Sequence, residues 1–253
     1  MLKEERQQII METLRRDGKI VAADLSQVIA VSEDTIRRDL RDLADAGLIQ
    51  RVHGGALLRS PAGASYRERQ FLSGSAKVSI AKAAVSLVRN RQVIILDGGT
   101  TTLEIARRLP IDLHATIVTN SPPVAVALAD YPDIQVVMIG GHLLAPSQVT
   151  IGAAALQAFS SIHADLCMLG VCSLHPELGV SIPVYEESLI KRIMVDNSAE
   201  VAALVTVDKL GTGAPYTVAP ISDLTYIITE PDAPDEVLAP YANKGITIMK
   251  EKV

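Results

Sequence analysis

The sequence of 253 residues contains no tryptophan, only two phenylalanines and six tyrosines, so aromatic residues make up 3% of the chain. Hydrophobic residues still reach 48%, which predicts an α/β core built mainly from Ala, Val, Ile and Leu. Cysteine is scarce as well. Cys167 and Cys172 have no metal-ligating neighbours in the sequence and are typical of buried thiols in a reducing cytosol. The sequence therefore predicts no metal site.

Targeting and cofactor motifs are also missing. The N-terminus, MLKEERQQ, lacks the features of a signal peptide, and no apolar stretch is long enough to cross a membrane. We therefore expect a cytoplasmic protein with no membrane partner. There is no G-x-x-x-x-G-K-[ST] motif, and no G-x-G-x-x-G follows an expected strand. The sequence thus predicts no nucleotide cofactor.

The chain has no large excess of one charge, since its net charge is −5 at pH 7. Residues 1–60 hold ten Lys and Arg against ten Asp and Glu, so the negative excess lies in the rest of the chain. The acidic larger part is a poor polyanion binder by itself. If the N-terminal segment binds nucleic acid, its basic side chains must converge on one face.

Residues 31–58, VSEDTIRRDLRDLADAGLIQRVHGGALL, have the pattern of a helix followed by a hairpin. Ile36, Leu40 and Leu43 share one helical face, with Ser32 as the N-cap and Gly47 at the C-terminal end. The hairpin pattern consists of an apolar strand at 48–49, a basic tip at 51–53, a Gly-Gly turn at 54–55 and a return strand at 56–58.

Upstream, the sequence predicts a helix over 22–30 and a first helix that contains Ile9, Ile10 and Leu14. Three helices followed by a glycine-turned hairpin are the plan of a winged helix-turn-helix, which indicates DNA binding. The alternative is that the arginines on the outer helix face are only solvated. The expected DNA-binding residues are Ser32, Thr35, Arg37, Arg38, Arg41, Arg51, His53 and Gly54.

The run TIRRDLRDLADAGLIQRVHGGAL resembles the DNA-binding signature of the DeoR family of bacterial transcription regulators. The resemblance covers about the first quarter of the chain. It implies a repressor, usually of sugar or nucleoside catabolism genes, that is relieved by a phosphorylated metabolite.

Small residues, Pro and Gly replace the periodic pattern at 59–65, which indicates an interdomain linker. We expect a DNA-binding domain at 1–58, a linker at 59–76, and an effector-sensing and oligomerisation domain at 77–253. Beyond the linker, short apolar runs alternate with helical stretches, which favours a mainly parallel sheet covered on both faces. Strands are expected at 93–96, 116–118, 134–139, 165–169, 201–207 and 226–229, and helices at 77–89, 103–109, 124–129, 153–159 and 186–197.

The loop Asp97–Thr102 lies between an expected strand and a helix predicted to start near Leu103. Its glycines let backbone N–H groups approach a ligand, and its threonines offer hydroxyls, which suits a phosphate. A plain turn with a threonine cap is an equally good interpretation of the motif. Lys209 follows a later strand and is a suitable counter-charge. Glu187 and Lys191 are four residues apart on a helix, which by itself favours a surface ion pair.

DGGTT, VTNS, IGG, LGV and the E-x-x-x-K-R helix resemble, in order, the effector domain of DeoR regulators. That resemblance implies a fold similar to ribose-5-phosphate isomerase and CoA-transferase-like enzymes. It assigns effector binding to Asp97, Gly98, Gly99, Thr100, Thr101, Asn120, Lys191 and Lys209. One departure concerns Asp208, because the family commonly has Ser before the lysine. The added carboxylate either weakens phosphate binding or points away from the site.

Two functions remain open at this stage. The first is a DNA-binding repressor controlled by a small phosphorylated sugar, and the second is a sugar-phosphate isomerase that carries a DNA-binding appendage. An isomerase needs a base beside the substrate carbonyl. Glu187 is the one candidate, and the loop after Leu169 reads Gly-Val-Cys-Ser without acidic groups, so the sequence favours a sensor that is not an enzyme. We expect a homodimer or homotetramer on double-stranded operator DNA.

Overall fold

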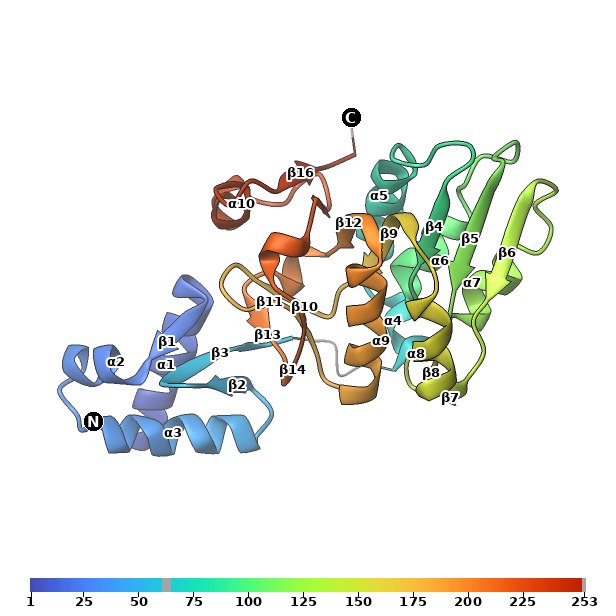
Figure 1. Cartoon of the computed structure of the whole chain (residues 1–253). Coiled ribbons are helices and arrows are strands. Elements are labelled where there is room, and N and C mark those ends of the chain that lie inside the picture. Colours follow the sequence, from blue (N-terminus) through green and yellow to red (C-terminus); the bar gives the residue numbers. More distant parts are fainter. Residues whose placement is uncertain (61–64, 252–253) are drawn as a thin grey trace.

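The computed structural model describes residues 1–60 and 65–251. Its N-terminal part is a three-helix core with a small sheet (Figure 1). Ile10, Leu14, Ile36, Leu40 and Leu43 are buried together where the helices meet. This arrangement confirms the winged helix-turn-helix that the sequence predicts. Its elements are α1 (Lys3–Asp17), β1 (Lys19–Val21), α2 (Ala22–Val28), α3 (Glu33–Asp45), β2 (Ile49–Val52) and β3 (Gly55–Arg59).

The helix α3 begins and ends where the sequence predicts. The Ser32 side chain accepts a hydrogen bond from the Thr35 backbone N–H, and Gly47 has a φ of 75° just beyond the C-terminus. Strand β1 is too short to be visible in the pattern, but it pairs with β3 in antiparallel fashion. The hairpin tip is His53–Gly54, because Arg51 and Val52 still belong to β2.

The larger part is built on a seven-stranded sheet, ordered β16-β15-β12-β9-β4-β5-β6, in which every neighbouring pair is parallel. This confirms the α/β class and the mainly parallel sheet. Six strands correspond to expected runs, although the expected strand at 201–207 is shifted to Ser198–Leu204. The strands are β4 (Val93–Leu96), β5 (Ala115–Thr119), β6 (Ile134–Met138), β9 (Ala164–Gly170), β12 (Ser198–Leu204), β15 (Tyr226–Ile228) and β16 (Thr247–Met249).

Helices cover both faces of the sheet (Figure 1), and β4 shows why its run is continuously apolar. Ile94 and Leu96 belong to the core under α5, α6 and α7, whereas Ile95 belongs to the core under α8, α9 and α10. Alternate side chains of a strand point to opposite faces, so both must be apolar. The helices are α5 (Gly74–Val85), α6 (Thr100–Ala106), α7 (Pro122–Ala127), α8 (Ala153–Ser160), α9 (Tyr185–Asp196) and α10 (Asp235–Ala242).

Several short elements were not expected from the sequence. They form a hairpin, a three-stranded antiparallel sheet ordered β10-β11-β14, a two-residue strand and two 3-10 turns. Runs of two to four residues carry too little periodicity to be recognised. These elements are β7 (His142–Leu144), β8 (Val149–Ile151), β10 (Ser173–His175), β11 (Gly179–Ile182), η1 (Val207–Lys209), β13 (Thr212–Gly213), β14 (Tyr216–Ala219) and η2 (Ile221–Asp223).

The segment at 59–76 is more ordered than a plain linker. It contains α4 (Tyr66–Phe71), whose Tyr66 side chain is buried, and the start of α5, while residues 61–64 lie outside the described part. Ser65 and Glu68 form a capping box at the start of α4. No helix of the described residues is long and apolar enough to cross a membrane.

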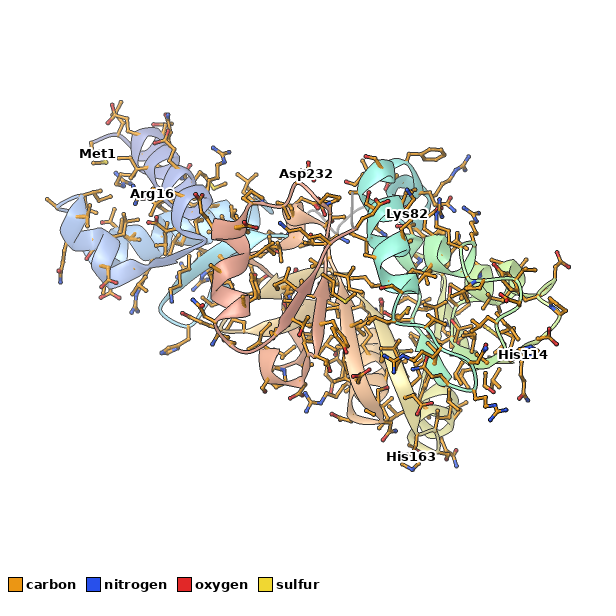
Figure 2. The ribbon with its side chains drawn as sticks, turned by 90° about the horizontal axis from the view of Figure 1, so that it is seen from above. Met1, Arg16, Lys82, His114, His163 and Asp232 are labelled. Carbon is orange, nitrogen blue, oxygen red and sulfur yellow. The ribbon has the colours of Figure 1, made fainter. Side chains whose placement is uncertain are left out.

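The two parts are joined by more than the chain between them. Strand β13 pairs in parallel with β3, with Thr212 opposite Leu58 and Gly213 opposite Arg59. An ion pair at 2.6 Å links Lys19 to Glu177. Figure 2 shows the molecule as elongated, with Met1 and Arg16 near one end and His114 near the other.

Candidate functional site

The first candidate site is the outer face of α3 with the wing. Arg37, Arg38, Arg41, Arg51 and His53 are all exposed. Arg37, Arg51, His53 and Gly54 line one depression of about 230 Å³ between α3 and the hairpin. Basic side chains from two separate segments therefore converge on one surface, as a local positive field requires in an N-terminal segment with no net charge.

Two of these arginines are held by acids on their own helix. Arg37 pairs with Glu33 and Arg38 with Asp34, each at 2.7 Å and four residues apart. Exposed pairs of this kind contribute only about 0.3–0.5 kcal/mol, so a phosphate or a base can displace the carboxylate. Among the described residues, Arg41 has no ion-pair partner. The Ser32 and Thr35 hydroxyls lie 2.8 Å apart at the start of α3.

The second candidate site is a cavity of about 30 Å³ at the carboxyl ends of β4 and β9. That volume holds about one or two water molecules. Six of the eight residues that the sequence assigns to the effector line it, although they come from three separate segments. The predicted residues in the lining are Gly98, Gly99, Thr100, Thr101, Lys191 and Lys209.

The glycine-threonine loop forms one wall of this cavity. Helix α6 begins at Thr100, earlier than the predicted start near Leu103, because Gly99 serves as the N-cap and the Thr102 hydroxyl donates to the Gly99 carbonyl at 2.9 Å. A Cβ atom on Gly98 would lie 2.0 Å from the Val149 side chain. Gly99 has a φ of 151°, which side chains rarely tolerate. Both positions therefore require glycine.

Lys191 is buried in the second wall. Its ammonium donates to Asp97 and, at 3.0 Å, to the Gly170 carbonyl, while Glu187 lies 3.8 Å away. Burial lowers the pKa of Lys191, but the Asp97 and Glu187 charges raise it more, so the net shift is upward. The interpretation of Glu187 and Lys191 as a surface ion pair is wrong, because both side chains are buried.

Asp97 and Asn120 lie behind the lining residues. Asp97 accepts from Lys191 and from the Gly170 backbone N–H at 2.9 Å, so it orients the cation. The Asn120 amide donates to the Thr150 carbonyl at 2.9 Å, while its Oδ1 is buried with no hydrogen-bond partner in the described structure.

Lys209 donates to the Val171 carbonyl at 2.9 Å. Burial lowers its pKa, and the nearby Asp208 carboxylate opposes that shift. Asp208 itself lines an adjoining cavity of about 40 Å³ together with Lys209 and Lys77. The added carboxylate therefore lies beside two lysines.

Sequence reasoning missed two contributors to the cavity, Arg69 of α4 and Ser147. The Ser147 hydroxyl donates to Glu187 at 2.9 Å. Arg69 falls in the expected linker, where no periodic pattern marked it. Its capping box, Ser65-x-x-Glu68, is the one signal that could have revealed the helix that carries it.

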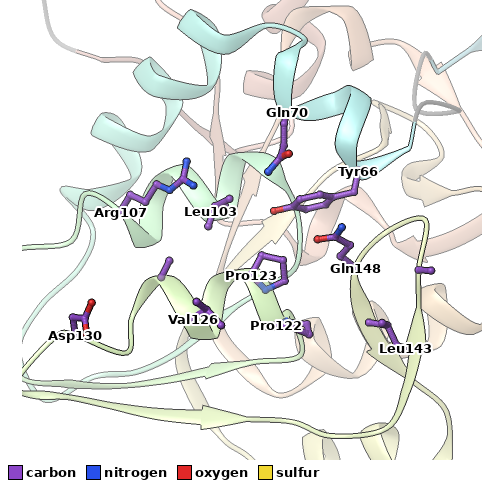
Figure 3. Close-up of a pocket in the computed structure, with 12 residues that line it drawn as sticks. Tyr66, Gln70, Leu103, Arg107, Pro122, Pro123, Val126, Asp130, Leu143 and Gln148 are labelled. Atoms are coloured by element: carbon purple, nitrogen blue, oxygen red, sulfur yellow. The ribbon is translucent and has the colours of Figure 1, made fainter.

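A larger cavity, of about 710 Å³, lies on the other side of α4 (Figure 3). Figure 3 shows Tyr66 and Gln70 of α4 facing Pro123 and Val126 of α7. Its described lining includes none of the predicted effector residues and is largely apolar. The lining residues identify the candidate site better than the cavity volume does, because the 30 Å³ cavity combines cations with the glycine-threonine loop. The cavity of about 30 Å³ is therefore the candidate ligand site.

Comparison with known proteins matches both parts of the chain. Residues 6–62 match the DeoR-like helix-turn-helix domain and residues 73–231 match the DeoR C terminal sensor domain. The chain is 33% identical to the HTH-type transcriptional regulator GlpR of Haloferax volcanii, with 98% of each chain covered. It is 30% identical to the glycerol-3-phosphate regulon repressor of Escherichia coli, with 94% of this chain and 95% of the relative covered.

Solved structures give weaker similarity. Ribose 5-phosphate isomerase A of Methanocaldococcus jannaschii aligns at 20% identity and a TM-score of 0.38, over 53% of this chain and 52% of that one. A TM-score of this size supports no argument about fold or activity.

Proposed function

The chain belongs to the DeoR family of transcriptional regulators, and on this premise we propose that it represses carbohydrate or nucleoside catabolism genes under the control of a phosphorylated sugar. In this proposal the protein binds operator DNA as a homodimer or homotetramer in the cytoplasm. Residues 1–58 form the DNA-binding domain, and residues 59–76 connect it to the larger domain. Residues 77–253 bind the effector and form the contacts between subunits.

The DNA-binding roles follow from position. Arg37 and Arg38 lie on the exposed face of α3 and are suited to base edges in the major groove. Arg51, His53 and Gly54 at the wing are suited to backbone contacts. Ser32 at the N-cap of α3, and Thr35 and Arg41 within the helix, offer further polar and cationic contacts that help to fix its register on the duplex.

The effector's phosphate would lie against the loop from Gly98 to Thr101, with Lys209 as a counter-charge. Asp97 keeps Lys191 in place, and Asn120 supports the wall from behind. Glu187 and Ser147 are placed to hydrogen-bond sugar hydroxyls.

The observation that best supports ligand control of DNA binding is the short chain segment that connects the cavity to the wing. Lys209 lines the cavity, and β13 begins three residues later and pairs with β3 of the winged domain. The Thr212 hydroxyl donates to the Lys209 carbonyl at 2.7 Å. On a second path, the Ser60 hydroxyl, next to β3, donates to the carbonyl of the cavity residue Cys172. A ligand that prefers one arrangement of these contacts would change DNA affinity.

A thermal-shift screen against phosphorylated sugars, followed by gel-shift titration with any ligand found, tests this function. A ligand that binds only the folded state raises the melting temperature and, for an inducer, releases operator DNA. If no phosphorylated sugar does either, the proposal is wrong. For the isomerase alternative, conversion of ribose 5-phosphate to ribulose 5-phosphate by pure protein is the readout, and we expect none.

A further inference from the structure

Arg69 of α4 lines the proposed effector cavity, and its guanidinium has no partner among the residues that the structure describes. Its Nε is buried and makes no hydrogen bond, and no ion pair connects it to another described residue. Buried polar groups in native proteins are nearly always hydrogen-bonded, and a charged group gains most from a partner. An orphaned guanidinium beside a cavity therefore indicates that a ligand completes its contacts.

The other two cations of the cavity already have partners. The Lys191 ammonium is bonded to Asp97 and to the Gly170 carbonyl, with Glu187 nearby. Lys209 donates to the Val171 carbonyl and has a pKa lowered by burial. Arg69, in contrast, has no ion-pair partner among the described residues, and its buried Nε has no acceptor there. It is the cation with the most to gain from an anion.

We propose that Arg69 is the residue that selects for a phosphorylated effector, by binding the phosphate through its guanidinium fork. This inference rests on the proposed function and deepens it. Counted by formal charge, the cations around this cavity and the adjoining one outnumber the carboxylates by one: Arg69, Lys77, Lys191 and Lys209 against Asp97, Glu187 and Asp208. A phosphate monoester complements that charge, and guanidinium matches phosphate with two parallel hydrogen bonds.

If Arg69 binds the phosphate, helix α4 connects ligand binding to the DNA-binding part of the protein. The cavity holds about 30 Å³, whereas pockets for small ligands occupy about 300 Å³ or more. The site must therefore open to take a sugar. Helix α4 is attached at its first residue, where the Tyr66 backbone N–H donates to the Pro146 carbonyl at 2.9 Å, and at its end, where Lys77 donates to the Arg69 and Leu72 carbonyls. Because α4 is the first helix after the wing, a ligand held by Arg69 acts on the connection to the DNA-binding part.

The test compares Arg69→Gln, Arg69→Lys and a control, Arg67→Gln, which changes an exposed arginine on the same helix. The probe is inorganic phosphate, with melting temperatures measured against chloride at equal ionic strength. We expect Arg69→Gln to weaken phosphate binding about tenfold to a hundredfold, as for loss of a charged hydrogen bond. Arg69→Lys keeps the positive charge but lacks the guanidinium fork, so its phosphate affinity should lie between those of wild type and Arg69→Gln. Arg67→Gln should match the wild type.

Stability without ligand provides the second readout. Removing a half-buried charge whose Nε has no partner in the described structure should leave Arg69→Gln at least as stable as wild type in chloride. Equal phosphate affinity in Arg69→Gln and wild type overturns the assignment of Arg69 and leaves the proposed function intact. A wild type that is stabilised neither by inorganic phosphate nor by any phosphorylated sugar overturns both.

Discussion

At the scale of single residues, two arginines of the proposed DNA-binding face form ion pairs with acids on their own helix. The pairs Arg37–Glu33 and Arg38–Asp34 are exposed and weak. They hold the guanidinium groups along the helix at little energetic cost. A bidentate contact between arginine and guanine is worth about 1–3 kcal/mol of discrimination, more than such a pair.

We therefore predict that Arg38→Ala lowers operator affinity about tenfold or more and reduces preference for operator over random DNA. Arg51→Ala is the matched comparison at the wing, and it should weaken binding to all sequences alike, with a salt dependence flatter by about one unit of slope. Fluorescence anisotropy with operator and random duplexes over a range of salt concentrations measures both. Unchanged binding by Arg38→Ala would remove it from the interface.

Lys77 gives stability a specific pH dependence. Burial, together with the like charges of Lys209 and Arg69, lowers its pKa from the ordinary 10.5 to about 8. Between those values the unfolded chain binds the proton and the folded protein does not, so this group makes stability rise with pH. A neutral amine keeps two N–H donors, so the hydrogen bonds to the Arg69 and Leu72 carbonyls persist.

We predict that the difference in free energy of unfolding, wild type minus Lys77→Met, increases between pH 7.5 and pH 9.5 by at most about 2 kcal/mol. Urea denaturation at the two pH values measures it. Parallel pH profiles for the two proteins would show that the proton is not lost in this range.

The sequence identifies the residues whose role depends on local chemistry and misses those that depend on folding. Ser32, Gly47 and the 98–102 loop are recognisable from short motifs. The burial of Glu187 and Lys191 is not, because the i, i+4 spacing is the same for surface and buried pairs. Arg69 could not be assigned either, since its place in the cavity depends on how α4 packs against the turn near Pro146.

At the scale of elements, helices and core strands with clear periodicity were predictable, and short pairings were not. The runs that became β4, β5, β9 and β15 were recognised because they are apolar and mostly buried, and β6 was recognised as a short apolar run although it is only partly buried. Strand β13 has two residues, and its pairing with β3 joins positions more than 150 residues apart. No local pattern encodes such a contact, although it is the most direct connection between the two parts.

This pairing predicts a variant that separates sensing from response. A Cβ on Gly213 would lie 2.7 Å from the Leu57 side chain, so Gly213→Val should displace β13 from β3. We expect effector affinity within about threefold of wild type, while the effect of the ligand on DNA affinity falls from the about 5- to 150-fold typical of allosteric coupling toward none.

Gly74→Ala is the control for Gly213→Val, because its added Cβ meets no heavy atom within 4 Å and its backbone is helical. Calorimetry measures effector binding and gel shift measures coupling. Full coupling in Gly213→Val would show that the signal does not pass through this pairing.

At the scale of the whole molecule, one recognition helix buries too little surface for operator-grade affinity, and helix-turn-helix proteins usually pair on half-sites. We predict assembly through the larger domain, where exposed apolar side chains such as Val126 and Leu143 border the 710 Å³ cavity. Sedimentation at micromolar concentration should give at least twice the 27.0 kDa of one chain. A 27.0 kDa species with and without DNA would contradict this.

In the proposed function, an effector bound at the loop Asp97–Thr102 controls DNA binding. The most direct test is the effector concentration that releases half of the operator DNA, compared between wild type and two loop variants. Gly99→Val places a side chain at a φ of 151°, and Thr101→Val removes one hydroxyl with little change in shape. With DNA affinity and melting temperature of the free proteins as controls, we predict that both variants bind operator normally and need at least about tenfold more effector for release. Release of all three proteins at the same concentration would contradict the account.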